Sequence, residues 1–435
     1  MEAVLAFGLL IGLILGGMWV QFSVAGAGLF YIWLLKGTAG WKALGIVSWG
    51  AANSFTLAAI PLFVLMAEIL LGSGLSTRLY NGIAPFMRRL PGGLLHTNIV
   101  GSGIFAAISG GSSPTAAAMS TVALPELGAR GYDRRIVAGS LAAGGTLGIL
   151  IPPSVILVIY GLLTETSIGK LFIAGIVPGF LGVLLYLAAV RWTIMRDPEA
   201  GPAGDRTDRT GRFEALKNVW AVLLLFFLVI GGLYGALDVW PIHLTFSPTE
   251  AAGMGAAGAF LIALSRGTLT FRTTLAVLIE TAQTTAALFS VLIGAWIFSN
   301  FVNLAGLPEA LKAMVSSAGW SPMTVMIMIL LIYVVLGCVF ESLSMLLLTV
   351  PIFFPLVTSI GFDPVWFGII VVVVTEISLI TPPVGLNVFV LKGVIGDVST
   401  GTIFRGVTPF WVVDIIRLAL LVLIPSLVLF LPNSM

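Results

Sequence analysis

The chain has 435 residues, of which 58% are hydrophobic and 9% are charged, and its mean hydropathy is +1.10. Soluble domains carry about 25% charged residues, so the composition predicts an integral membrane protein, and the continuous apolar runs predict an all-α fold. Cys338 is the single cysteine, which excludes an internal disulfide and a cysteine-based metal cluster, and the net charge of +2 is no indication of a nucleic-acid partner.

Apolar runs follow one another along the chain and predict membrane helices. They lie at 3–20, 22–35, 50–72, 92–128, 136–161, 171–191, 218–239, 249–265, 273–301, 321–359, 365–393 and 406–431. The first run has an acidic residue and no basic n-region before it, and therefore predicts a membrane segment and not a cleaved signal peptide.

The one clearly hydrophilic stretch, 196–217, predicts a flexible linker between two halves of the chain. The N-terminal half is 1–195 and the C-terminal half is 218–435, and each is expected to contain scaffold helices, a hairpin and a broken helix. The basic residues of the linker place it in the cytoplasm by the positive-inside rule.

The run 92–128 predicts a re-entrant hairpin. As one helix it would be roughly 55 Å long, against a hydrocarbon core of about 30 Å, and it is short for two complete spans. Arg88 and Arg89 precede it, and Arg130 and Arg134 follow it, so both ends are basic and face the cytoplasm. The expected tip is 109–114.

The run 321–359 has a similar length but lacks the basic flanks, and it predicts a second hairpin that enters from the opposite face, with its tip at 340–344. Opposite orientation predicts an inverted repeat. One ungapped register supports it, because Ser112 falls on Ser342 and Pro125 falls on Pro355.

The pairs Pro152-Pro153 and Pro382-Pro383 fall on each other in the same register, and they break the helices predicted at 136–161 and 365–393. A proline lacks the N–H that would bond the carbonyl four residues earlier. The carbonyls of Gly148, Ile149, Ser378 and Leu379 are therefore expected to be free. Inverted-repeat transporters use such carbonyls and half-helix ends to hold Na⁺ and an anionic substrate.

The predicted substrate and ion site combines the hairpin tips with the helix breaks. It contains Ser109, Gly110, Gly111, Ser112, Ser113, Gly148, Ile149, Pro152, Pro153, Glu341, Ser342, Ser344, Ser378, Leu379, Thr381, Pro382, Pro383 and Asn387. The predicted Na⁺ ligands are Ser112, Gly148, Ser342 and Ser378. The alternative is that the proline pairs only kink helices and the Ser/Gly runs only pack them. Matched hairpins and matched proline pairs favour the site.

Four glutamates lie in or near apolar runs, where an ionisable group is a functional hypothesis. Glu341 and Glu376 lie beside the predicted site. Each is expected either to take part in that site or to cap a helix or be exposed at the membrane interface. Glu68 and Glu280 are expected at membrane boundaries or paired with polar groups. His96 and His243 are too few and too far apart for a metal site.

The segments GIFAAISGGSSPTAAAMSTVALPEL (103–127), GTLGILIPPSVILVIYG (145–161), VPIFFPLV (350–357) and TEISLITPPVGLNVFV (375–390) resemble the large membrane (M, DctM-like) subunit of TRAP transporters, the tripartite ATP-independent periplasmic transporters. The resemblance covers most of the chain. It implies a multi-pass, elevator-type transporter of the bacterial inner membrane that imports an organic acid, a carboxylate or dicarboxylate, driven by a Na⁺ gradient.

The resemblance also implies two protein partners, a small membrane (Q) subunit and a periplasmic substrate-binding protein (the P subunit). Glu341 stands where the resemblance leads us to expect an aspartate at the start of the second tip. The chain carries no fused small subunit, so that partner is expected to be a separate protein.

Two other functions are weighed. An intramembrane enzyme would need paired carboxylates, a Ser/His pair or a metal-ligand set in the apolar runs, and none has convincing spacing. No GxxxxGK[ST] sequence is present, so ATP is not the expected energy source. Within transporters, the alternative is a stand-alone Na⁺/carboxylate symporter or Na⁺/H⁺ antiporter of similar architecture.

Overall fold

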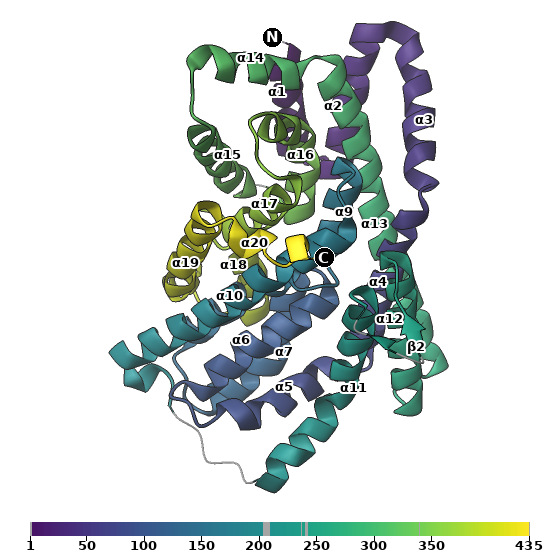
Figure 1. Ribbon diagram of the computed structural model, residues 1–435. Coiled ribbons are helices and arrows are strands. Elements are labelled where there is room, and N and C mark those ends of the chain that lie inside the picture. Colours follow the sequence, from purple (N-terminus) through teal and green to yellow (C-terminus); the bar gives the residue numbers. More distant parts are fainter. Residues whose placement is uncertain (1, 203–208, 236, 240–241, 339, 435) are drawn as a thin grey trace.

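The computed structural model describes residues 2–202, 209–235, 237–239, 242–338 and 340–434, and almost all of them lie in helices (Figure 1). The first half of the chain forms α1 (Glu2–Leu15), α2 (Val20–Lys36), α3 (Gly40–Ala52), α4 (Ala59–Gly72), α5 (Leu75–Met87), α6 (Gly93–Ser109), α7 (Ser112–Ala129), α8 (Arg134–Gly144), α9 (Val155–Thr164) and α10 (Ile168–Arg196).

The second half contains α11 (Arg209–Leu233), α12 (Pro248–Ser265), α13 (Phe271–Leu304), α14 (Leu307–Ala318), α15 (Pro322–Gly337), α16 (Ser342–Ser359), α17 (Pro364–Ser378), α18 (Leu386–Ile395), α19 (Thr400–Leu423) and α20 (Ser426–Leu429). Two short strands, β1 (Leu237–Val239) and β2 (Ile242–Leu244), pair antiparallel between α11 and α12. Short 3₁₀ turns include η2 (Phe55–Ala58) and η3 (Gly148–Leu150).

Both predicted hairpins and both predicted helix breaks are present in the fold. Helices α6 and α7 pack against each other across a turn at Gly110-Gly111, and α15, which ends at Gly337, packs against α16, which begins at Ser342. Residue 339, between α15 and α16, lies outside the described residues. The first proline pair separates α8 and η3 from α9, with a bend of 46°. The second separates α17 from α18.

Three of the sequence-based boundaries are wrong. The run 50–72 begins inside α3, and the chain turns at 53–54 before η2 and α4. The apolar run 218–239 ends as a helix at Leu233, because the chain then turns into β1. Part of the linker 196–217 is helical, since α11 starts at Arg209; residues 203–208 of that linker lie outside the described residues.

Helices at matched positions of the two halves begin in the same way. Gly74 before α5 and Gly306 before α14 both have a left-handed φ, of 70° and 66°, which glycine adopts without steric cost. Asp133 caps α8 by accepting from the N–H of Arg135, and Asp363 caps α17 by accepting from those of the second and third residues after it. The same cap residues thus start helices at matched positions of the two halves.

A close helix crossing holds the helix-break region together. Gly139 of α8 and Gly406 of α19 lie so close that a Cβ on either would collide with backbone atoms of the other helix region. Further along α19, Tyr186 of α10 donates a hydrogen bond of 2.5 Å to Asp414, and Asp414 pairs with Arg417 at 2.9 Å; all three side chains are buried. Helix α19 is therefore held both by a close glycine contact and by a buried charge pair.

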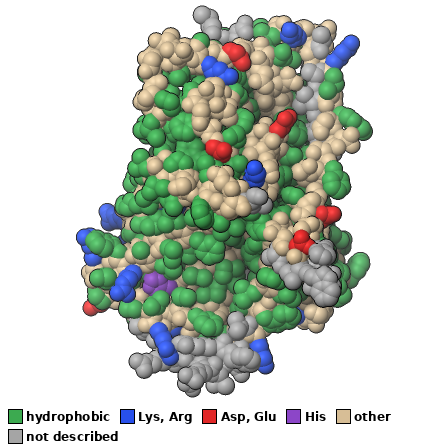
Figure 2. Space-filling view, viewed as in Figure 1, with side chains coloured by type: hydrophobic (Ala, Val, Ile, Leu, Met, Phe, Trp, Pro, Cys, Tyr) green, Lys and Arg blue, Asp and Glu red, His purple; other side chains and the backbone are tan. Residues whose placement is uncertain are grey.

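Among the described residues, five helical segments are long and apolar enough to cross a membrane, or six if the bent α8–α9 pair counts as one span. They are Phe55–Gly72, Ile168–Arg196, Phe271–Leu304, Ser342–Ser359 and Thr400–Leu423. Apolar side chains dominate the face shown in Figure 2, and Lys and Arg lie mainly toward its two ends. The chain is an integral membrane protein by length and composition of its helices.

Candidate functional site

The two hairpin tips meet at a cavity of about 340 Å³. The first tip lines it with Ser109, Gly110, Gly111, Ser112, Ser113 and Pro114, and the second tip with Glu341, Ser342 and Leu343. Ile149 and Leu379, which belong to the two helix breaks, also line it. Val64 of α4 and Thr284 and Leu288 of α13 close another side. Residues far apart in the sequence therefore form one site.

Glu376 joins the two tips. It lies in the last turn of α17, and its side chain is 1% exposed. Ser112 donates its hydroxyl proton to Oε2 of Glu376, and Ser342 donates its proton to Oε1 at 3.0 Å. One buried carboxylate thus binds the first helical residue of both α7 and α16.

A second link connects only the first tip to the helix breaks. Ser113 donates to Oδ1 of Asn387 at 2.8 Å, and Nδ2 of Asn387 donates to the carbonyl of Ala142 at 3.3 Å. Asn387 lies in the first turn of α18 and is fully buried, and Ala142 belongs to α8. The register places Leu343 where the first tip has Ser113, and that side chain has no hydroxyl to make this link.

The first tip is built on glycine. Gly110 ends α6 with a left-handed φ of 66°, and Gly111 stands at the N-cap of α7 without a side chain to cap it. Ser109 is held by a 2.6 Å hydrogen bond with the hydroxyl of Thr115. The N–H groups in the first turn of a helix have no partner within the helix, so this end of α7 faces the cavity with free donors and a partial positive charge.

The second tip is capped by its own carboxylate. Glu341 occupies the N-cap of α16, and its Oε2 accepts from the N–H of Leu343 at 3.2 Å and of Ser344 at 3.4 Å. The negative charge also compensates the partial positive charge at this helix end. Glu341 therefore performs the capping role that the sequence left open, at the edge of the cavity.

The expectation of free carbonyls at the proline pairs is wrong for three of the four positions. The carbonyl of Gly148 accepts from Ile151 at 2.9 Å, that of Ser378 from Thr381 at 3.1 Å, and that of Leu379 from Asn387 at 3.1 Å. The chain tightens into a turn after each helix, so residues of the break supply the missing N–H groups. Each carbonyl keeps a second lone pair that a cation could use.

Several predicted residues do not reach the cavity. Gly148 packs directly on α6, because a Cβ there would collide with the backbone of Ala107. The hydroxyl of Thr381 accepts from Trp411 at 2.9 Å and donates to the carbonyl of Ile377 at 2.7 Å. The remaining members that do not line the cavity are Pro152, Pro153, Ser344, Ser378, Pro382, Pro383 and Asn387. They shape the breaks behind the tips.

The set of predicted site residues omitted Glu376, which the structure places at the centre. A glutamate inside an apolar run, six residues before Pro382, was the available signal. Spacing could not reveal that its partners are two serines from different hairpins. Within the described parts of the chain, His, Cys, Asp and Glu form no group of three or more that could hold a metal ion, so the oxygen donors at the tips are hydroxyls, carbonyls and single carboxylates.

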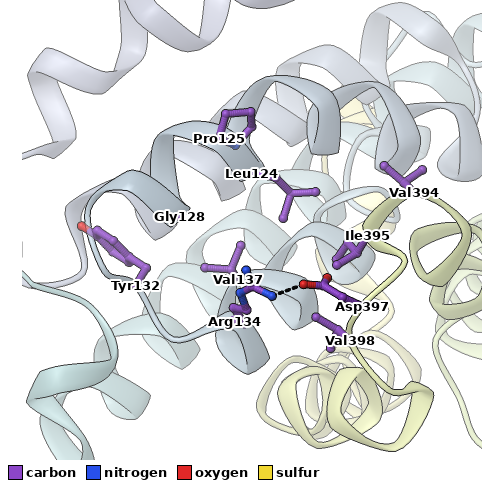
Figure 3. Close-up of a pocket in the computed structure, with 10 residues that line it drawn as sticks. All are labelled: Leu124, Pro125, Gly128, Tyr132, Arg134, Val137, Val394, Ile395, Asp397 and Val398. Atoms are coloured by element: carbon purple, nitrogen blue, oxygen red, sulfur yellow. Dashed lines mark hydrogen bonds and ion pairs between the residues drawn. The ribbon is translucent and has the colours of Figure 1, made fainter.

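A second cavity, of about 270 Å³, lies between α7, α8 and the end of α18 (Figure 3). Arg134 and Asp397 face each other across it and form an ion pair, while Leu124, Val137 and Ile395 line it. Both charged side chains are largely exposed. The Arg134 guanidinium holds the pKa of Asp397 below its usual value by a hydrogen bond. This pair links the two halves outside the tips.

Comparison with known proteins gives consistent matches over nearly the whole chain. Residues 7–427 match the family described as "Tripartite ATP-independent periplasmic transporter, DctM component". The C4-dicarboxylate TRAP transporter large permease protein DctM of Pseudomonas aeruginosa is 34% identical over 394 residues, which cover 90% of each chain. The sialic acid TRAP transporter large permease protein SiaM of Vibrio cholerae is 33% identical over 429 residues, or 97% of this chain and 96% of that one.

Among solved structures, that of the YdaH transporter of Alcanivorax borkumensis is similar in fold. It aligns with a TM-score of 0.54 at 15% sequence identity and covers 89% of both chains. At this identity, the similarity concerns the arrangement of the helices alone.

Proposed function

The chain belongs to the family of DctM components of tripartite ATP-independent periplasmic transporters, and from this premise we propose that it couples Na⁺ entry to the import of an organic carboxylate across the bacterial inner membrane. The family consists of transporter subunits and not of enzymes. Na⁺ is a transported ion in this proposal, and the chain needs no organic cofactor.

One observation carries the proposal. Ser112 and Ser342 both give their protons to Glu376, beside a cavity that the two tips share. Each hydroxyl oxygen then keeps its lone pairs for a cation. Carbonyl and hydroxyl oxygens are hard ligands of the type that Na⁺ prefers, and the buried negative charge of an ionised Glu376 would favour a cation nearby. Ser112 and Ser342 are the proposed Na⁺ ligands at the tips. Gly148 and Ser378, the other two predicted ligands, lie outside the lining of this cavity, so any contribution they make is proposed to come from behind the tips.

The substrate carboxylate is proposed to bind at the start of α7. This helix end faces the cavity with free N–H donors, whereas Glu341 already occupies the corresponding end of α16. Both relatives named above are named for carboxylate substrates, C4-dicarboxylates and sialic acid. A carboxylate or dicarboxylate is therefore the proposed substrate class.

An inverted repeat with an elevator motion is the proposed mechanism of transport. The matched caps, hairpins and helix breaks of the two halves support the repeat. The cavity supports the motion, because the tips and breaks form one side of it, while α4 and α13 form the other. Movement of the first group along the second would carry the site across the membrane.

Two partners complete the proposed transporter, a small membrane subunit and a periplasmic substrate-binding protein. The family description names a tripartite system, which requires components beyond this chain. We place the binding protein on the loops at 238–248 and 302–320; residues 240 and 241 of the first loop lie outside the described residues. The second loop contains α14, a short helix on which Glu309 is exposed and Lys312 is partly exposed.

Reconstitution tests the function. The chain is placed in liposomes with its small membrane subunit, and uptake of radiolabelled succinate and sialic acid is measured with the binding protein outside. We expect uptake of one of these acids only with an inward Na⁺ gradient and only with the binding protein. Equal uptake in K⁺ alone would contradict Na⁺ coupling. Full uptake by this chain without its partners would instead support a stand-alone symporter.

A further inference from the structure

We propose that Glu376 is a positioning residue that makes cation binding at the two hairpin tips interdependent, an inference that rests on the proposed Na⁺ coupling. The carboxylate has two oxygens, and each accepts one serine proton. Ser112 and Ser342 come from different hairpins, 230 positions apart in the sequence. A single side chain thus sets the orientation of two proposed cation ligands.

The protons determine what each serine can offer to a cation. A serine hydroxyl has one proton and two lone pairs. When the proton points to Glu376, both lone pairs are available to a cation in the cavity. When the proton points toward the cavity, it meets the cation with a partial positive charge. Glu376 therefore selects the ligating orientation at both tips at once.

Burial makes this selection strong. Ser112 is 5% exposed and Ser342 is 3% exposed, so little water competes for either proton. Both oxygens of Glu376 accept when the side chain is ionised, and hydrogen bonds to an ionised acceptor are roughly twice as strong as neutral ones. Every residue of α17 from Val365 to Ser378 is buried, which shields the carboxylate and both hydrogen bonds from water.

The shared acceptor leads to cooperativity. In the absence of cations, the position of each tip is set partly by its hydrogen bond to Glu376. A cation bound at Ser112 fixes the first tip and with it one oxygen of Glu376. The second oxygen is then already positioned to accept from Ser342. Binding of the second cation therefore loses less conformational entropy of the second tip, and its affinity is higher. Coupling of this kind between sites typically amounts to about 5- to 150-fold in affinity.

Replacement of Glu376 by glutamine is the sharpest test. The amide keeps one acceptor oxygen but replaces the other with an NH₂ group, which donates. One of the two serines must then turn its proton away and lose its ligating orientation. Glu376→Asp keeps both acceptors but withdraws them by one methylene. Glu280→Gln makes the same chemical change in a carboxylate on α13, and Ser120→Ala removes a buried hydroxyl that bonds only its own helix, at the carbonyl of Ala116.

The measurement is equilibrium binding of radiolabelled Na⁺ to the purified full chain in nanodiscs, with thermal unfolding as the check of folding. We expect wild type to bind with a Hill coefficient above one, and both controls to match it. Glu376→Gln should lower the Hill coefficient to one and raise the half-saturating Na⁺ concentration by at least about 5-fold. An unchanged Hill coefficient and affinity in Glu376→Gln would overturn the inference.

A second measurement covers the case in which Glu376→Gln does not fold. Ser112→Ala, Ser342→Ala and the double variant form a cycle, and we expect the double variant to lose less Na⁺ affinity than the sum of the two single losses, since either change alone already breaks the coupling. Strict additivity would overturn the inference. Absence of saturable Na⁺ binding to wild type would contradict the proposed function itself, which is a different outcome.

Discussion

The two hairpin tips share a backbone plan and differ in chemistry. In one register, Gly110 and Gly111 of the first tip correspond to Phe340 and Glu341 of the second, whereas Ser112 corresponds to Ser342. The shared serines bind the same carboxylate. The glycines leave the start of α7 uncapped, and Glu341 caps the start of α16.

Two tips of similar backbone plan can thus carry different chemistry. Both tips keep a serine oxygen that suits a cation, so the proposed ion chemistry is duplicated. The positively polarised helix end is open at one tip and internally satisfied at the other, so the proposed carboxylate has one place to bind. Three variants that each change one of the two tips, and one that changes the ion pair outside them, test this difference.

Giving the first tip the cap of the second should have the largest effect. Gly111→Asp places a carboxylate at the N-cap of α7, where the extended φ of −144° accepts a side chain. It should displace the substrate carboxylate and weaken substrate binding by about 10- to 100-fold, since a hydrogen bond to a charged group contributes about 1.5–3 kcal/mol. Binding of the transported acid to purified protein measures it. Gly111→Ala adds a Cβ without a charge and is the control; equal losses in both variants would argue against a substrate at this helix end.

Removal of the N-cap residue of the second tip should lower the free energy of unfolding but have little effect on substrate affinity. Glu341→Ala leaves the N–H groups of Leu343 and Ser344 unpaired and should cost about 0.5–2 kcal/mol in the free energy of unfolding. Glu341→Asp retains an N-cap acceptor and should stay within a few tenths of a kcal/mol of wild type. Thermal unfolding in the same nanodiscs measures both. A stable Glu341→Ala protein with no substrate binding would show that Glu341 contacts the substrate instead.

Removing the extra link of the first tip should have a moderate effect. Ser113→Ala eliminates the hydrogen bond to Asn387, and its loss should cost about 0.5–1.5 kcal/mol. Thermal unfolding measures the change, and Ser113→Thr, which keeps the hydroxyl, is its control. No loss of stability in Ser113→Ala would mean that the tip is held by Glu376 and packing alone.

Loss of the ion pair between Arg134 and Asp397, which lies outside the tips, should have the smallest effect on stability. Arg134→Ala removes the partner that lowers the pKa of Asp397, and both groups are largely exposed, where ion pairs contribute little. The pKa of such a carboxylate is lower in the folded state than in the unfolded state. Its ionised form therefore stabilises the fold at pH values above the unfolded-state pKa, and this stabilisation is lost as the pH falls through the folded-state pKa. The small difference between wild type and Arg134→Ala should therefore be present at pH 7, begin to fall near the unfolded aspartate pKa of about 3.9, and vanish only below the lower folded-state value. A difference that grows as the pH falls would contradict this assignment of charge.

Much of the fold follows from patterns that the sequence displays. Run lengths predict both hairpins, and flanking arginines support the first. The proline pairs predict both helix breaks, because backbone geometry at proline is a local property. The matched glycines and aspartates mark repeated helix starts for the same reason. The strands after Leu233 and the helix that begins at Arg209 were missed, since short apolar or charged segments fit more than one structure.

Part of the predicted residue set lies together in the fold, while its role as a substrate and ion site stays a prediction. Residues 109–113, Glu341 and Ser342 line one cavity, and Ser344 does not. The free carbonyls at Gly148, Ser378 and Leu379 were wrong, because the turn that follows a break is a tertiary feature and provides its own donors. The sequence placed Glu376 beside the predicted site, unlike Glu68 and Glu280, but it could not show its two serine partners, since these are brought together by folding.

An experimental structure of the chain with Na⁺ and its transported carboxylate most directly tests whether both tips bind a cation and only the first binds the substrate. We expect one cation bonded to the Ser112 hydroxyl and another to the Ser342 hydroxyl, with each serine still donating to Glu376. The substrate carboxylate should accept from the N–H groups at the start of α7. A carboxylate bound at the start of α16, or serine protons turned away from Glu376 with no cation at either tip, would contradict it.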